Sequence, residues 1–255
     1  MKTLFKKLPI IGPLLRSGTH ALRDSVRKVR REKQAYQFVR QNPAHSEHPD
    51  RVRVMNILNY TKTSEKAYNG GRFPAGYHSL HLGELQLEGQ REPMERIKLV
   101  PLDFTGLTVL DIGCNQGGML YSLSSKLAHG IGIDFDSRLI NAANKIKSHA
   151  KIIKLDFYVF NLEKEDLNII RDFLPAERVD VVFLLAVCMW IDNWKEVIQF
   201  ARSISTHMLF ETNGKPEQQM EQVSYLQSLY GSVQLLSEQS NEDVLQRNRK
   251  LYLCS

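Results

Sequence analysis

From residue 105 to the end of the chain, short apolar runs alternate with amphipathic segments. The runs have the length and composition of β-strands and cover residues 108–112, 129–134, 157–160, 179–185, 208–211, 233–236 and 250–254. The segments between them have the apolar period of helices and cover residues 117–127, 137–148, 163–173, 194–204 and 216–229. The run at 179–185 does not alternate, as in a strand that is buried on both faces. This pattern predicts an α/β fold, a three-layer sandwich with a mostly parallel sheet.

The first 104 residues are patterned differently. Residues 19–41 predict a helix with basic residues between its apolar ones, and a polar stretch with prolines follows. A short helix is predicted at 52–58, and alternating leucines at 78–88 predict a hairpin. We therefore expect three regions: a basic helical arm at 1–50, a cap or hairpin region at 51–104, and an α/β domain at 105–255.

The net charge of +6 is unevenly distributed. Residues 1–53 hold 13 Lys and Arg against four Asp and Glu, whereas the remaining residues carry a net charge of −3. Three roles of the arm stay open: a solvated helix over the mouth of the site, a contact of residues 1–40 with an anionic membrane, or a contact with RNA phosphates. The membrane role rests on six apolar residues among the basic ones, Phe5, Leu8, Ile10, Ile11, Leu14 and Leu15.

Composition narrows the class of protein. Hydrophobic residues make up 42% of the 255 residues and charged residues 24%, as in globular proteins. No apolar run approaches the roughly 18 residues of a membrane-spanning helix, and we expect no secretory signal. Cys114, Cys188 and Cys254 are far apart, so we expect neither a disulfide framework nor a metal site. These features indicate a cytoplasmic protein, peripheral at the inner face of a membrane if the arm binds one.

The segment 109–118 carries the clearest chemical signal. A predicted strand ends at Asp111, a glycine turn follows, and a helix begins at once. The glycines at 113, 117 and 118 do not fit a dinucleotide fingerprint, and the lysine of a phosphate-binding loop is absent from the segment. An acid before the turn suits a ligand that carries an ammonium group.

Polar residues also follow the next predicted strands. Asp134, about 20 residues past the turn, can accept hydrogen bonds from ribose hydroxyls. Phe135 could cover an adenine face or belong to the core, and Asn161 could read an adenine edge or serve a turn. Asp134 could instead cap the next helix. The fourth predicted strand ends at Ala186 and its neighbours.

Together these segments resemble class I S-adenosylmethionine-dependent methyltransferases over about residues 105–255. VLDIGCNQGG resembles the first motif of that family and GIDFD the second. The resemblance implies a Rossmann-like sandwich with a seven-stranded sheet, S-adenosyl-L-methionine as cofactor, and an enzyme of class EC 2.1.1.-. It implies a cofactor site formed by Asp111, Gly113, Cys114, Asn115, Gly117, Asp134, Phe135, Asn161, Ala186 and Arg91. Asn115 stands where the family usually has a third glycine.

The block before the first motif, with Gly89-Gln90-Arg91, is similar to a branch that includes enzymes related to wobble-uridine tRNA modification. This similarity implies that Gln90, Arg91 or Arg96 faces the site, with an arginine pairing a carboxylate of cofactor or substrate. A solvated helix face is the alternative for the arginines. His78 and Tyr77 are the candidates for a general base or for acceptor contacts, against a loop histidine without a catalytic role.

Three functions remain open from the sequence. The first is methyl transfer to a small-molecule, glycan or lipid-linked acceptor. The second is methylation of tRNA, and the third is a catalytically silent module that binds cofactor or a partner. Glu211 and Asn213, after the fifth predicted strand, could contact substrate, or Asn213-Gly214 could be an ordinary turn.

Overall fold

The computed structural model describes residues 41–61, 73–240, 243 and 247–255. Most of the predicted arm, including the expected membrane contact of residues 1–40, lies outside these described residues. In the described part of the chain, no helix is long and apolar enough to cross a membrane.

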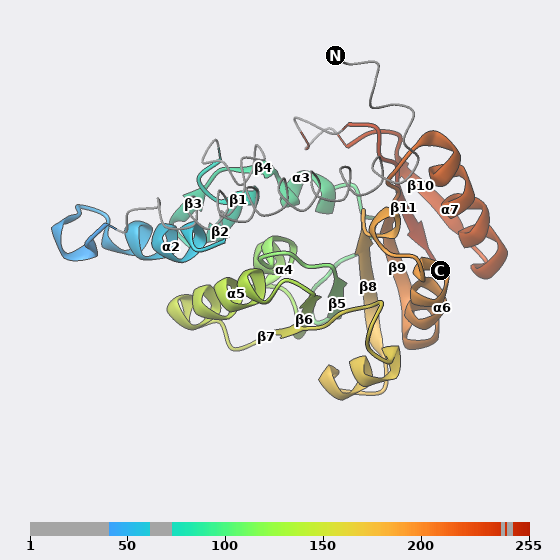
Figure 1. Ribbon diagram of the computed structural model, residues 1–255, viewed down its shortest axis with the longest axis horizontal. Coiled ribbons are helices and arrows are strands. Elements are labelled where there is room, and N and C mark those ends of the chain that lie inside the picture. The colour runs from blue at the N-terminus through green and yellow to red at the C-terminus, as the bar shows by residue number, and fades with distance from the viewer. Residues whose placement is uncertain (1–40, 62–72, 241–242, 244–246) are drawn as a thin grey trace, which may run out of the picture.

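A seven-stranded sheet forms the centre of the molecule (Figure 1). Its strands, in spatial order, are β10 (Val233–Ser237), β11 (Leu251–Cys254), β9 (Ser205–Glu211), β8 (Val179–Leu185), β5 (Thr108–Ile112), β6 (His129–Asp134) and β7 (Leu155–Val159). The five strands from β9 to β7 are parallel, and β11 runs antiparallel between β9 and β10. The predicted α/β sandwich with a mostly parallel seven-stranded sheet is confirmed.

Helices cover both faces of this sheet. One layer contains α4 (Gly118–Leu123) and α5 (Ser137–Ala150), and the other contains α6 (Trp194–Ile204), α7 (Pro216–Leu229) and the 3₁₀ helix η3 (Leu167–Phe173). Neighbouring residues of one strand belong to different cores, because successive side chains point to opposite faces. Val181 and Phe183 pack with the α4–α5 layer, whereas Val182 and Leu184 pack with the α6–α7 layer.

A cap of short elements lies over α4 and α5 (Figure 1). It contains the 3₁₀ helix η2 (Pro43–His45), α2 (Pro49–Asn59), β1 (Gly76–His78), β2 (Leu80–Leu82), β3 (Leu85–Leu87), β4 (Gly89–Arg91) and α3 (Pro93–Ile97). The predicted hairpin is confirmed as β2 paired with β3, and its turn contains Gly83 with φ 57°. Strand β4 pairs with β1, and its last residue, Arg91, also bridges to Asp243 near the end of the chain. Arg91 therefore links the cap to the last part of the described sequence.

Several predicted elements differ in extent, and three of these differences have a local reason. Helix α4 ends at Leu123, four residues early, where the Ser124 hydroxyl bonds the Tyr121 carbonyl and the chain turns. Strand β7 begins at Leu155 because its backbone pairs with Gly130 of β6. The predicted helix at 163–173 is only η3, because the Asp166 side chain caps Asn168 and delays the start of the helix.

Candidate active site

The turn between β5 and α4, here called the glycine turn, covers residues 113–117 and has three residues with positive φ. Gly113, Asn115 and Gly117 have φ values of 79°, 55° and 81°. A Cβ on Gly113 would lie 2.6 Å from the Val187 Cγ2, so only glycine fits there. Asparagine tolerates the left-handed region better than most residues, and this explains how Asn115 can stand where the related motif has glycine.

Asp134, the last residue of β6, holds this turn in place. Its Oδ2 accepts the Asn115 N–H at 2.9 Å and its Oδ1 accepts the Asp136 N–H at 2.9 Å. Each carboxylate oxygen has a further lone pair that can accept a ribose hydroxyl. The helix-cap alternative for Asp134 is wrong, because Asp136 caps α5 by accepting the Arg138 N–H.

The aromatic and amide candidates lie near the ends of β6 and β7. Phe135 is 74% exposed, so it is not a core residue and its ring is accessible to a ligand. The Asn161 Oδ1 accepts the Glu163 N–H at 3.0 Å, the geometry of a turn. This bond occupies one lone pair of the Asn161 amide oxygen. Asn161 therefore serves a turn, which was the alternative to reading an adenine edge.

Asp111 and Cys114 are buried beneath the glycine turn. No described residue donates a hydrogen bond to the Asp111 Oδ2. Burial, with a smaller contribution from Asp134, raises the pKa of Asp111 to about 8. A ligand ammonium group at this oxygen would favour the charged carboxylate, so the residues fit the amino-acid end of S-adenosylmethionine. Burial also raises the pKa of the Cys114 thiol, which packs beneath Gly132 and is not a reactive nucleophile.

His78 does not fit the expected role of general base. The residue is buried, and its Cβ lies 2.3 Å from the position that a Cβ on Gly118 would take. Burial first, and Arg91 second, lower the pKa of His78 to about 3. A group with this pKa is neutral at physiological pH and a weak proton acceptor. His78 is therefore a neutral imidazole. Its two ring nitrogens have no hydrogen-bond partner among the described residues.

Tyr77, the other candidate base, is held by arginines. Its phenol oxygen accepts Nη1–H groups of Arg91 at 3.0 Å and of Arg249 at 3.3 Å. Its ring lies 4.6 Å from the His78 ring. The two candidates therefore lie together. His78 is beside Gly118, and Tyr77 is beside the arginines.

Arg91 belongs to a buried set of charges, here called the Glu211 cluster, whose members are Arg91, Arg96, Glu211, Ser240, Asp243 and Arg249. Arg91 grips the Glu211 carboxylate with both Nη atoms, at 2.9 and 2.5 Å, and Arg96 donates to the same carboxylate at 3.2 Å. The alternative of a solvated helix face is therefore wrong for both arginines. Arg91 was expected to pair with a carboxylate of cofactor or substrate, whereas its carboxylate partner in the structure is the chain's own Glu211.

Sequence reasoning missed the contributions of Ser240, Asp243 and Arg249 to this cluster. The Ser240 hydroxyl donates to Glu211 at 2.7 Å, and Asp243 accepts a hydrogen bond from Gln90 at 2.9 Å. The segment around residue 243 has no periodicity, so no local signal marks these residues.

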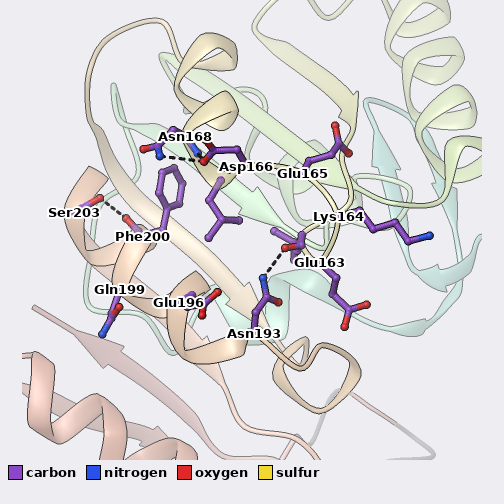
Figure 2. Close-up of a pocket in the computed structure, with 12 residues that line it drawn as sticks. Glu163, Lys164, Glu165, Asp166, Asn168, Asn193, Glu196, Gln199, Phe200 and Ser203 are labelled. Atoms are coloured by element: carbon purple, nitrogen blue, oxygen red, sulfur yellow. Dashed lines mark hydrogen bonds between the residues drawn. The ribbon is translucent and has the colours of Figure 1, made fainter.

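A separate cavity of about 660 Å³ lies between the turn after β7 and helix α6. Figure 2 shows its lining, in which Glu163, Glu165, Asp166 and Glu196 are acidic and Lys164 is basic. The Asn193 amide bridges the two walls by donating to the Leu162 carbonyl at 2.6 Å. No residue of the glycine turn lines this cavity, so the cavity is distinct from the candidate cofactor site. Among the described residues, no group of three or more His, Cys, Asp or Glu could hold a metal ion.

Comparison with protein families now decides the identity. A family model described as a methyltransferase domain matches residues 85–248, which begin at β3 and include every member of the Glu211 cluster except Arg249. This chain belongs to the methyltransferase domain family. Membership confirms the expected class of protein, a methyltransferase, and its expected cofactor, S-adenosylmethionine.

Solved structures agree with the fold of this methyltransferase domain. WbdD, crystallised with the kinase inhibitor LY294002, matches with a TM-score of 0.52 and 20% identity over 66% of this chain. The N-terminal domain of EvdMO1 with SAH bound matches with a TM-score of 0.51 and 12% identity over 64% of this chain and 80% of its own. The chain spans only 42% of the WbdD chain. No curated protein matches.

Proposed function

We propose that this methyltransferase domain transfers the methyl group of S-adenosylmethionine to a small-molecule, glycan or lipid-linked acceptor in the cytoplasm. The observation that carries the proposal is the geometry of the glycine turn. Asp111 presents a buried oxygen with no donor among the described residues, and Asp134 stands at the end of the adjacent strand. This pair matches the ammonium group and the ribose of one ligand.

Each proposed contact follows from the chemistry of a residue. Asp111 would pair with the ammonium group, Asp134 would accept ribose hydroxyls, and Phe135 would cover the adenine. Gly113 and Gly117 give the backbone room to approach. When bound, the cofactor supplies a methyl group on a positively charged sulfur. The chain's own residues then have to align the acceptor and exclude water, and neither task requires a covalent intermediate.

The distribution of charge supports a small or lipid-linked acceptor over tRNA. The chain after residue 53 carries a net charge of −3, which would not attract a phosphate backbone to the site itself. The basic arm keeps tRNA as the second candidate, because it could supply phosphate contacts. The N-terminal domain of EvdMO1 was also crystallised with SAH and D-fucose, so sugars enter the first acceptor screen.

Calorimetric titration with S-adenosylmethionine and S-adenosylhomocysteine tests the proposal. Replacing Asp134 by Ala removes a charged hydrogen-bond acceptor, and we expect the affinity to fall about 10- to 100-fold. Asp156→Ala is the matched control. Asp156 lies on the neighbouring strand β7, outside the glycine turn, and pairs with Lys147 of α5. Absence of binding by the intact protein would contradict the enzyme proposal and favour a silent module.

Acceptor identity requires a second experiment. The protein is incubated with labelled S-adenosylmethionine and with sugars, lipid-linked sugars or tRNA, and transfer of the label is measured. Label in a sugar or lipid fraction supports the proposal, whereas label in tRNA alone would replace it with the second candidate.

A further inference from the structure

Asn213 holds the turn that follows β8. It lies two residues past the end of β9, and its side chain is completely buried. Its Nδ2 donates to the Ala186 carbonyl, and its Oδ1 accepts the Met189 N–H at 3.0 Å. One amide thus bonds both ends of the segment 186–189. An ordinary surface turn, which the sequence allowed at this position, would not need a buried amide.

The segment that Asn213 holds is strained. Ala186 has a φ of 60°, the left-handed region that residues with a side chain rarely adopt. The Ala186 N–H donates to the Glu211 carbonyl at 3.0 Å, so this residue is fixed on both its backbone groups. Strained backbone of this kind persists only where its surroundings over-determine it, and it is concentrated at functional sites.

The strained segment leads directly to the cofactor turn. Val187 follows Ala186, and its Cγ2 lies 2.6 Å from the position of a Cβ on Gly113. The next residues, Met189 and Trp190, are 40% and 66% exposed. The conformation of Ala186 therefore sets both the contact of Val187 with the glycine turn and the position of two exposed apolar side chains.

Asn213 is itself fixed by helix α7. Its N–H donates to the Gln222 Oε1 at 3.1 Å, and the Gln222 Nε2 donates to its carbonyl at 3.0 Å. Gln222 is 3% exposed, so water competes little for these bonds. A continuous set of contacts thus runs from α7 through Asn213 and the strained segment to Gly113.

We infer that Asn213 is a positioning residue, which keeps Ala186 in its left-handed conformation and so presses Val187 against the cofactor turn. This inference rests on the proposed function for its effect on cofactor binding. Asn213 is completely buried and acts through its bonds to Ala186 and Met189, so it determines the shape of the segment 186–189 beside the glycine turn.

The test compares Asn213→Ala, Ala186→Gly and the double variant by calorimetric titration with S-adenosylhomocysteine. We expect Asn213→Ala to weaken binding about tenfold, as loss of a pair of buried hydrogen bonds would. Ala186→Gly serves as the reference for the double variant, because Ala186 itself belongs to the expected cofactor site. The double variant should recover most of the affinity, because glycine adopts a φ of 60° without the steric cost. A merely structural role of Asn213 predicts no such recovery.

Asn144→Ala is the matched control. Asn144 also donates its Nδ2 to a backbone carbonyl, that of Phe157, but outside the segment 186–189. Wild-type affinity in Asn213→Ala, a loss no larger than in Asn144→Ala, or a double variant as weak as Asn213→Ala would each overturn the inference.

Hydrogen exchange separates this inference from the proposed function. Asn213→Ala should speed exchange of the Met189 amide at least tenfold without any ligand, because that amide loses its acceptor. If the intact protein binds no cofactor but the exchange changes as expected, the proposed function fails and the restraint on the turn stands. Unchanged exchange at Met189 would overturn the restraint.

Discussion

Two buried side chains beside the glycine turn have protonation states that differ from their ordinary ones. Asp111 is an acid whose pKa is raised to about 8, and His78 is a base whose pKa is lowered to about 3. Burial favours the neutral form in both cases. At neutral pH the unliganded site therefore contains a neutral carboxyl and a neutral imidazole.

Cofactor binding should release a proton from Asp111. At pH 7 this carboxyl is mostly protonated, and a ligand ammonium group beside it lowers its pKa. We expect release of close to one proton at pH 7 and much less at pH 9, where the carboxyl is already ionised. Calorimetry of S-adenosylhomocysteine binding in buffers of different ionisation enthalpy measures this number. Asp111→Asn is the control, and an equal release by this variant would contradict the assignment.

His78 should make the fold sensitive to acid. Its pKa in the folded protein lies below the ordinary histidine value of about 6.5, so the unfolded chain binds one more proton between about pH 3 and 6.5. Its stabilising contribution is therefore complete above pH 6.5 and is lost as the pH falls. Relative to His78→Gln, the wild type should lose about 2 kcal/mol of unfolding free energy between pH 7 and pH 5. Urea denaturation at both pH values measures this, and parallel losses in the two proteins would refute it.

Individual site residues were predictable where they follow a strand in an ordered motif. Asp111 and Asp134 were found because each is an acid at or next to the end of a predicted strand. The buried state of His78 was not predictable, because it depends on the packing of β1 against Gly118, far along the chain.

At the scale of elements, the glycine turn and the segment after β8 depend on each other's shape. Gly113 and Gly106 have nearly equal φ values of 79° and 77°, but only Gly113 lies against another segment. At Gly106, a Cβ would meet nothing within 4 Å. The two glycines therefore separate the cost of the backbone conformation from the cost of the close contact.

Gly113→Ala should be more harmful than Gly106→Ala. Both substitutions incur about 1–2 kcal/mol for the left-handed conformation. Gly113→Ala should add about 1–3 kcal/mol of overpacking against Val187 and should weaken cofactor binding. Urea denaturation and calorimetric titration of both variants measure these effects. Equal losses of stability and unchanged affinity would show that the contact with Val187 is unimportant.

The Glu211 cluster joins the cap strand β4 to the sheet strand β9. Glu211→Gln would leave the buried charges of Arg91 and Arg96 without their shared carboxylate, and we expect a loss of about 3–5 kcal/mol. Glu221→Gln removes an exposed pair with Lys195 and should cost under about 1 kcal/mol. Urea midpoints measure both, and a loss for Glu211→Gln as small as that of the control would contradict the role of the cluster.

The strands were easier to predict than the ion pairs that join the cap to the sheet. The runs at 108–112, 129–134 and 179–185 match β5, β6 and β8 in full, because buried parallel strands are continuous apolar runs. The partners of Arg91 were not predictable, because Glu211 lies 120 residues away and an ion pair leaves no periodic signal.

At the scale of the whole molecule, the charge of the chain is divided between two regions. The basic residues gather in the first 53 positions, while the rest of the chain is slightly acidic. Every residue of the proposed cofactor site that the structure describes belongs to the second region. Binding of cofactor and binding of an anionic surface are therefore expected to be separable.

Deletion of residues 1–40 should abolish binding to vesicles of anionic lipid and leave the affinity for S-adenosylhomocysteine within about twofold. Wild-type binding to the vesicles should also weaken as salt is raised, because the attraction is electrostatic. Vesicle co-sedimentation and calorimetry measure the two properties. Retained vesicle binding in the truncated protein would remove the membrane role from the arm, and loss of tRNA binding instead would favour the second acceptor class.

The link between Arg91 and the last part of the chain has a consequence for synthesis on the ribosome. Cap strand β4 emerges early, but its partners Glu211 and Asp243 are 120 or more residues later. At about 5–20 residues per second, the arginine side chains must stay hydrated for many seconds until those partners emerge. The contacts of Arg91 can form only after residue 243 has emerged, so a product that stops before this residue cannot complete the Glu211 cluster.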